Sequence, residues 1–317
     1  MTPGSPAGAA PPALSPAGAA PSEPSAARVV TIASGSIRAE LLPGIGARLH
    51  RLTVFGHELL RTPDDPQEHL HDPFRWGGYV MAPWCNRIDP VPTDVGGVVV
   101  DVPANSSDGT ALHGQVYMAA WEELGEGTFW VRGGGAGWPW PYETTLRVTT
   151  VDTPADAAII TFEQVLTNLG DRSMPGGVGF HPWFRGPLEV RIAAARVLPS
   201  NLAAGEPIVP VAGDFDLRVR RAMPVDLDAT WLDPADPPVA LWWPDPGVRA
   251  RLEVASDAGL CIVAASPAGA DAVAVEPETH APQGLRRLLT GAPHGLAWLA
   301  PGGSIHLTTR MIFERGA

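Results

Sequence analysis

The sequence lacks the features that mark several large classes of protein. No uninterrupted apolar run approaches the roughly 20 residues that a membrane-spanning helix needs, which excludes such a helix. Only 22 positions carry Lys or Arg against 34 with Asp or Glu, and the net charge is -12. A nucleic-acid-binding protein normally presents a basic face to the phosphates, so this balance argues against a nucleic-acid partner. We therefore expect a soluble protein that binds neither membrane nor nucleic acid.

Motifs for nucleotide and acyl-transfer chemistry are also missing. The sequence has no Gly-rich Walker-type loop, no G-x-G-x-x-G after a strand and no G-x-S-x-G elbow. Cysteine is scarce, and Cys85 and Cys261 each lie beside apolar or aromatic residues, as is typical of reduced, buried thiols. His69 and His71 resemble a pair of metal ligands, but no third ligand with zinc-like spacing accompanies them. No metal site is predicted.

The first segment of the chain differs from the rest in composition. Residues 1–27 are almost entirely Ala, Pro, Gly and Ser, which bury too little apolar surface to offset the entropy lost on ordering. We predict a disordered tail. The segment lacks a basic n-region and its apolar stretch is broken by Pro, so an export signal is disfavoured and a cytoplasmic location is expected. No strong linker divides the remainder, and residues 28–317 are predicted to form one domain.

Apolar and polar residues alternate with a period of two in much of this domain. In residues 142–148 the apolar side chains share one face with Thr144, and the charged side chains lie on the other. Residues 248–254 and 307–313 show the same alternation. This pattern is typical of strands that bury one face.

Turn-forming residues separate these strands. The clusters at 152–156, 168–171 and 256–259 predict chain reversals and antiparallel hairpins. The 35 Gly and 35 Pro residues would interrupt long helices, so only short ones are predicted. The sequence therefore predicts an all-β fold: one large antiparallel β-sandwich with a deep groove between or across its sheets.

One predicted strand ends on a carboxylate. Residues 272–275 are apolar, Glu276 follows, and Pro277 stops the strand. A rigidly held carboxylate beside apolar walls gains basicity and is a candidate general base. An exposed Glu at a strand end is the alternative interpretation, and Glu278, two residues on, is a rival candidate.

Other polar residues also lie in apolar surroundings. His181 stands among aromatic residues and could donate or accept a proton, although a hydrogen-bonded core histidine is the alternative. Trp183 offers a flat face on which a pyranose ring could stack. His113 precedes Gly114, which allows close approach of a substrate.

Further polar groups could bind hydroxyls. Asn86 and Arg87 supply fixed donors and acceptors, and Asp228 is a further acceptor. With Glu276 and His181, these residues predict proton-transfer chemistry on a neutral, hydroxyl-rich substrate.

Five short segments resemble, in the same order, the motifs of the aldose 1-epimerase family, the galactose mutarotases. The resemblance covers nearly the whole chain after the tail. The segments are Met81–Ile88 ending in Asn-Arg-Ile, Leu112–Gly114 with a His-Gly step, the Gly-aromatic-Pro turn at Gly137–Pro141, Asn168–Phe184 with its His-Pro-aromatic motif, and Val275–Pro277 around the Glu.

The resemblance implies a large β-supersandwich, an aldose substrate, and no metal or organic cofactor. It implies that Glu276 takes the proton from the anomeric hydroxyl and that His181 protonates the ring oxygen. By the same resemblance, His113 would assist at the ring oxygen, while Arg87 and Asp228 would bind sugar hydroxyls. The chain could be a monomer or a homodimer.

Three alternatives stay open at this point. A non-catalytic carbohydrate-binding protein would use the same groove and aromatic residues. An epimerase of a phosphorylated or modified hexose would share the fold, although the Phe-Pro-Gln-Phe-Gly-like segment of hexose-6-phosphate epimerases is missing. Hydrolysis of a glycosidic bond needs two carboxylates flanking that bond, and Glu276 and Glu278 stand too close for the inverting spacing.

Overall fold

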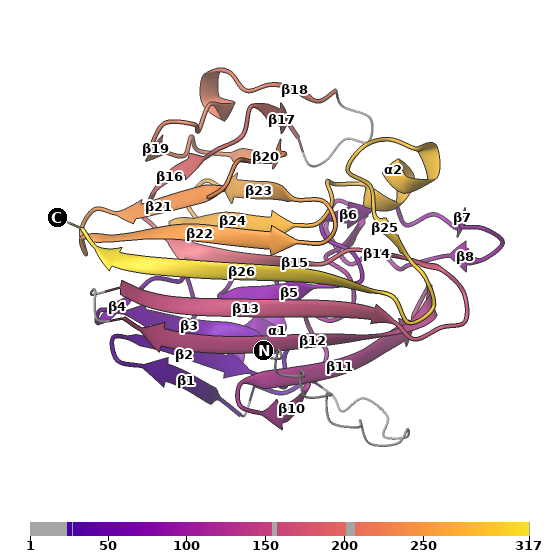
Figure 1. Ribbon diagram of the computed structural model, residues 1–317, viewed down its shortest axis with the longest axis horizontal. Coiled ribbons are helices and arrows are strands. Elements are labelled where there is room, and N and C mark those ends of the chain that lie inside the picture. The colour runs from indigo at the N-terminus through magenta and orange to yellow at the C-terminus, as the bar shows by residue number, and fades with distance from the viewer. Residues whose placement is uncertain (1–23, 27, 154–156, 201–206, 317) are drawn as a thin grey trace, which may run out of the picture.

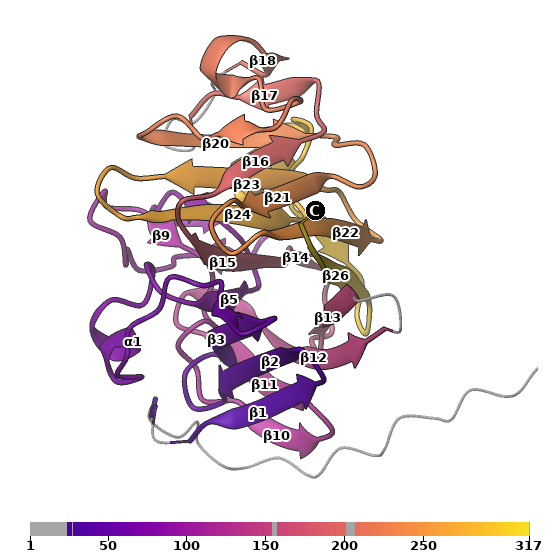
Figure 2. The same cartoon turned by 90° about the vertical axis from the view of Figure 1, so that its left-hand side faces the viewer.

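The computed structural model describes residues 24–26, 28–153, 157–200 and 207–316. Within these residues two large antiparallel sheets pack face to face, and the long strands β12, β13 and β26 cross the front of Figure 1. Figure 2 shows the strands of one of these sheets stacked from β1 near the bottom to β18 at the top. The predicted all-β antiparallel sandwich is confirmed.

The larger sheet has eleven strands. In spatial order they are β1 (Val30–Ser34), β2 (Ile37–Leu42), β3 (Arg48–Val54), β5 (Gly78–Met81), β15 (Gly179–Arg185), β24 (Ala272–Glu278), β23 (Cys261–Ser266), β20 (Leu227–Leu232), β17 (Arg196–Leu198) and β18 (Val209–Pro210), with β4 (His57–Glu58) paired to β3.

The second sheet has nine strands. They are β10 (Glu122–Gly125), β11 (Thr128–Gly135), β12 (Trp138–Asp152), β13 (Ala157–Asn168), β26 (Ser304–Arg315), β22 (Val248–Ser256), β21 (Val239–Trp243), β16 (Glu189–Ile192) and β19 (Arg221–Ala222).

Short ladders and short helices complete the fold. The two-stranded ladders are β6 (Arg87–Ile88) with β9 (Ala111–Leu112), β7 (Thr93–Asp94) with β8 (Val99–Val100), and β14 (Met174–Gly176) with β25 (Ala297–Leu299). The helices are α1 (Glu68–His71), α2 (Gly284–Thr290) and a 3-10 turn at Gly213–Phe215. Among the described residues, no helix is both long enough and apolar enough to cross a bilayer.

The predicted period-two strands are present. In β12 the residues Tyr142, Thr144, Leu146 and Val148 are all buried, while their neighbours are exposed or half-buried. The alternating segments 248–254 and 307–313 lie within β22 and β26, which pair with each other. A buried stripe on each strand therefore faces the space between the sheets, where most of the core lies.

The hairpin prediction is correct at one turn and wrong at two. β12 and β13 pair across the turn after Asp152, although residues 154–156 lie outside the described part of the chain. After Asn168 the chain leaves the sheet to form β14, and after Ser256 it passes from the nine-stranded sheet to β23 in the other sheet. Turn residues reverse the chain, but they do not determine which sheet the next strand joins.

The predictions for the N-terminal tail and for the two cysteines have different outcomes. Of the predicted disordered tail, residues 1–23 and 27 lie outside the described residues, whereas Ala26 is buried against Leu42 and Ile45. Cys85 and Cys261 are buried free thiols, as predicted.

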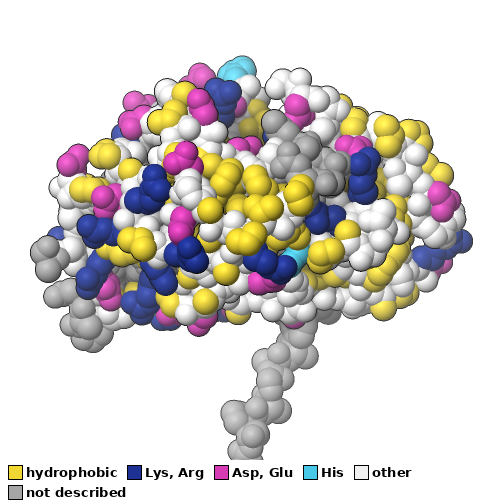
Figure 3. All heavy atoms as spheres, turned by 90° about the horizontal axis from the view of Figure 1, so that it is seen from above, with side chains coloured by type: hydrophobic (Ala, Val, Ile, Leu, Met, Phe, Trp, Pro, Cys, Tyr) yellow, Lys and Arg dark blue, Asp and Glu magenta, His cyan; other side chains and the backbone are white. Residues whose placement is uncertain are grey.

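Charges of both signs are interspersed over the face seen in Figure 3. The sequence contains no lysine, so every dark blue side chain in Figure 3 is an arginine.

Candidate active site

The polar residues singled out in the sequence gather on the outer face of the larger sheet. On β15, Phe180 stacks on Phe162 of the opposite sheet at a centroid distance of 4.4 Å. Because successive side chains of a strand point to opposite faces, His181 and Trp183 face away from the core on either side of Pro182. The groove therefore lies across the larger sheet and not between the two sheets.

Strand pairing brings the proposed acid and base together. β15 and β24 are antiparallel neighbours, and the register pairs Gly179 with Glu278 and Trp183 with Ala274. His181 consequently stands opposite Glu276. The Nε2 atom of His181 lies 3.2 Å from Oε1 of Glu276, and both side chains are buried.

A cavity of about 500 Å³ opens over this pair. This volume is typical of small-molecule sites. Its lining includes all seven residues that the sequence singled out for the site: Asn86, Arg87, His113, His181, Trp183, Asp228 and Glu276. The prediction that Pro277 stops the strand is wrong, because β24 continues through Pro277 to Glu278. Glu278 is not part of the lining and lies deeper in the sheet, which separates the two rival carboxylates.

Burial shifts the pKa values of Glu276 and His181 in opposite directions. Loss of hydration raises the pKa of Glu276 well above its ordinary value, and a negative charge on the nearby Glu278 would raise it further. Burial also lowers the pKa of His181 well below its ordinary value, helped by the neighbouring His113. The dry surroundings disfavour both charged forms, so the carboxylate is a stronger base and the imidazolium a stronger acid than in water.

His113 is fixed as a neutral hydrogen-bond donor. It follows β9, and its Nδ1 accepts a hydrogen bond of 3.2 Å from the backbone N–H of Asn86. In the neutral ring the proton must then lie on Nε2. Burial lowers the pKa of His113 to about 3, so the ring is neutral near pH 7. Its ring meets that of His181 edge-on, with centroids 5.0 Å apart.

Arg87 is oriented by two neighbours. Its Nε donates to Asp108 at 2.7 Å, and its Nη1 donates to Oδ1 of Asn86 at 3.2 Å. Asn86 has a positive φ of 51° and also accepts a hydrogen bond from the Arg87 backbone N–H, so its amide oxygen serves to hold Arg87 in place. The arginine hydrogen bond helps to lower the pKa of Asp108, which is therefore a carboxylate at neutral pH.

The segment 71–75 forms one wall of the cavity, and a buried arginine binds this segment and the following Trp76. Arg48 on β3 donates to the carbonyl of Trp76 at 2.9 Å and to that of Pro73 at 2.8 Å. Its guanidinium also lies 4.6 Å from the ring centroid of Tyr79, which itself stacks on His181. Burial lowers the pKa of Arg48 to about 10, so it stays charged at neutral pH. Arg48 thus links the wall to Tyr79 and, through Tyr79, to His181 on β15.

Replacing Arg48 with Met should loosen this wall. Two half-buried carbonyls would lose their donors, and we expect the free energy of unfolding to fall by about 1–3 kcal/mol. Because this wall borders the cavity, we expect KM for a substrate that binds there to rise at least about tenfold. Chemical denaturation and steady-state kinetics measure the two effects. Arg38→Met, which removes the exposed pair with Glu40, is the matched control and should change neither; an unchanged KM in Arg48→Met would contradict this role.

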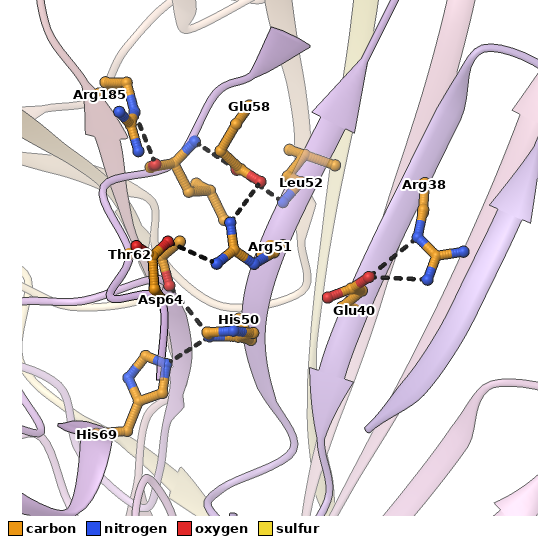
Figure 4. Close-up of polar contacts among 11 residues, drawn as sticks. Arg38, Glu40, His50, Arg51, Leu52, Glu58, Thr62, Asp64, His69 and Arg185 are labelled. Atoms are coloured by element: carbon orange, nitrogen blue, oxygen red, sulfur yellow. Dashed lines mark hydrogen bonds and ion pairs between the residues drawn. The ribbon is translucent and has the colours of Figure 1, made fainter. Parts of the chain in front are cut away.

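The two histidines of the His-Leu-His segment point to different places. Figure 4 shows the ring of His69 turned toward His50, with Nε2 and Nδ1 2.9 Å apart, while Thr62 contacts the same nitrogen of His50 at 3.1 Å. His71 instead lines the cavity. The two rings do not converge on one point, so they form no ligand pair.

A second arrangement has the spacing of a cation site. Among the described residues, one ligand atom from each of His113, His181 and Glu276 lies within 4.8 Å of the others. The direct contact between His181 and Glu276 accounts for the closest of these distances.

Several contributors escaped the sequence reasoning. Tyr79 stacks on His181 at 4.5 Å, and Phe74 accepts the indole N–H of Trp183 through its backbone oxygen at 2.5 Å. Arg48 and Asp108 act through other residues. Tyr79 alone had a detectable signal, because it lies in an apolar strand directly before the Met81–Ile88 segment.

The architecture places the protein in the class of mutarotase-like β-sandwiches. Solved structures with this fold include a galactose mutarotase-like protein from Clostridium acetobutylicum, with a TM-score of 0.74 and 16% identity over 90% of this chain and 95% of that one. An aldose epimerase homologue from C. elegans has a TM-score of 0.72 and 18% identity over 92% and 99%. Galactose 1-epimerase from Lactobacillus acidophilus has a TM-score of 0.67 and 16% identity over 91% and 95%. At these identities the likeness concerns the fold.

The sequence itself identifies the family. The aldose 1-epimerase family model matches residues 28–311, and the chain belongs to that family. A search of curated proteins found no significant match.

Proposed function

We propose that the protein is an aldose 1-epimerase that interconverts the α and β anomers of a free hexose. The observation that carries the proposal is the direct opposition of Glu276 and His181, 3.2 Å apart, at the floor of a sugar-sized cavity. Ring opening needs one group to remove a proton and another to supply one, and this pair can do both.

Ring opening uses the ionic form of the pair, which arises when the Glu276 carboxyl passes its proton to Nε2 of His181 across their 3.2 Å contact. The Glu276 carboxylate takes the proton of the anomeric hydroxyl while the His181 imidazolium donates to the ring oxygen. The C1–O5 bond breaks and the sugar becomes an open-chain aldehyde. The pair is then neutral, which is the form that its dry surroundings favour. Burial therefore assists ring opening.

Ring closure reverses these transfers. After rotation about C1–C2, neutral His181 takes the proton of the O5 hydroxyl, O5 attacks the other face of C1, and the Glu276 carboxyl protonates the new anomeric oxygen. Nε2 of neutral His113 donates a hydrogen bond to the ring oxygen. Arg87 and Asp228 bind hydroxyls, and Trp183 offers its face to the ring.

The charges around the cavity favour a free sugar over a phosphosugar. Arg87 is paired with Asp108 at 2.7 Å, and Arg75 lies 4.0 Å from Asp72. Each of these lining cations already faces a carboxylate. A phosphate would have to compete with these carboxylates, whereas neutral hydroxyls can be bound by them.

The test is the optical rotation of freshly dissolved α-D-galactose and α-D-glucose with the purified protein, in a buffer that catalyses mutarotation weakly. We expect acceleration with at least one sugar. We also expect the same rate after treatment with EDTA, because proton transfer by these side chains needs no metal. Measurable sugar binding without acceleration would contradict the proposal and favour a carbohydrate-binding protein.

A further inference from the structure

Behind Glu276 lies a second carboxyl group, that of Glu278. The two residues stand two apart on β24, so their side chains point to the same face of the sheet. Both are buried, but only Glu276 lines the cavity. Their carboxyl groups lie within hydrogen-bonding reach of each other.

Glu278 forms no ion pair within the described part of the chain. Across the sheet it stands between Gly179 on β15 and Cys261 on β23. Gly179 leaves room for it, because a Cβ there would lie 3.1 Å from Cγ of Glu278 and 2.7 Å from Sγ of Cys85. Among the described residues, both Glu278 oxygens and Oε2 of Glu276 have no hydrogen-bond partner when the carboxyls are unprotonated.

Other titratable groups face the two carboxyls from every packed element. His181 and His113 lie on the cavity side. The remaining groups are Cys85 from the loop before β6, Cys261 from β23, Arg87 from β6, Asp228 from β20 and Tyr79 from β5. Burial raises the pKa of both thiols and of Tyr79, so these three are neutral, and the Arg87 cation acts only through space.

We propose that Glu278 is a positioning residue that shares one proton with Glu276 and, as the neutral partner, donates a hydrogen bond to Oε2 of Glu276. This inference rests on the proposed function. The shared proton gives a partner to Oε2 of Glu276 and to one of the two Glu278 oxygens. It leaves Oε1 of Glu276 directed at His181 and free to accept the anomeric proton.

Electrostatic repulsion explains why the pair of Glu276 and Glu278 keeps one proton. Two carboxylates in contact inside a dry region repel each other strongly, so the pair releases its two protons in separate steps. Burial raises the pKa of both groups well above their ordinary values. Between the two steps the pair carries a single negative charge, which is the form that the base requires.

Two substitutions separate this role from others. Glu278→Met fills the same space without a donor, and Glu278→Gln keeps a neutral donor. Without the donor the Glu276 carboxylate is less stable, so we expect the acid limb of kcat/KM in Glu278→Met to move up by at least about one pH unit. In Glu278→Gln it should return toward the wild-type position. A downward shift in both variants would mean that Glu278 acts as a second charge, and no shift would mean a structural role; either overturns the proposal.

A readout that needs no turnover distinguishes failure of this inference from failure of the proposed function. The infrared spectrum of the wild-type protein at neutral pH should contain a protonated carboxyl band that is lost in Glu278→Gln. Thermal unfolding supplies a second measure. Because the folded-state pKa of Glu278 is raised, its contribution to stability is lost as pH rises above the ordinary 4.5. The Tm of Glu278→Gln relative to wild type should therefore be higher at pH 8 than at pH 5. Absence of both effects would overturn the shared proton whether or not the protein is an epimerase.

Discussion

Glu276→Gln should lower kcat for mutarotation by about 10²- to 10⁴-fold, the usual contribution of a positioned general base. The amide has nearly the size of the carboxyl, so it should leave the fold and KM close to wild type, but it cannot accept the anomeric proton. Polarimetry with the best substrate measures the rate, and thermal unfolding checks the fold. Glu163→Gln, which removes an exposed partner of Arg147, is the control and should retain full activity.

The same residue sets a pH dependence. The carboxylate is the active form, and burial raises the pKa of Glu276. Activity should therefore fall on acidification at a pH above 4.5, the ordinary value for a glutamate. An acid limb below that value, or a variant that keeps more than about a tenth of the rate, would remove Glu276 from the role of base.

His181→Gln should also reduce kcat by about 10²- to 10⁴-fold. Glutamine can still donate a hydrogen bond toward Glu276 but cannot carry the proton needed by the ring oxygen. His306→Gln, at an exposed position on β26, is the matched control. Because the acid and base act in one step, the double variant with Glu276→Gln should be little slower than the slower single variant. Fully multiplicative losses would mean that the two residues act independently.

Much of the fold could be predicted, because the alternation of apolar and polar residues within a single strand indicates which of its faces is buried. Residues 142–148 show one buried face in sequence and have it in β12. The assignment of strands to sheets could not be predicted. The turn at Ser256 has the same composition as a hairpin turn, yet it connects the two sheets. That outcome depends on packing between distant strands, which local turn chemistry does not encode.

The candidate site could likewise be predicted only in part. An apolar strand ending at Glu276 and an aromatic run around His181 each suggested a functional side chain. The contact between these two side chains depends on the register of β15 against β24, two strands that lie far apart in the sequence. The role of Arg48 could not be predicted for the same reason. Its hydrogen-bond acceptors are the carbonyls of Pro73 and Trp76, which only the fold brings close to it. The sequence left the direction of Glu278 open, because Pro277 was expected to stop the strand. The structure continues β24 to Glu278, and only the three-dimensional packing shows which of the two carboxylates reaches the cavity.

The exclusive use of arginine for basic side chains has a consequence for the chemistry. In the proposed reaction the sugar passes through an open-chain aldehyde, and aldehydes condense with the amine of lysine to form Schiff bases. All 22 basic residues are arginine, so the chain holds no lysine amine that could trap this intermediate. Positive charge is thus present on the protein in a form that stays protonated and does not undergo glycation through a lysine side chain.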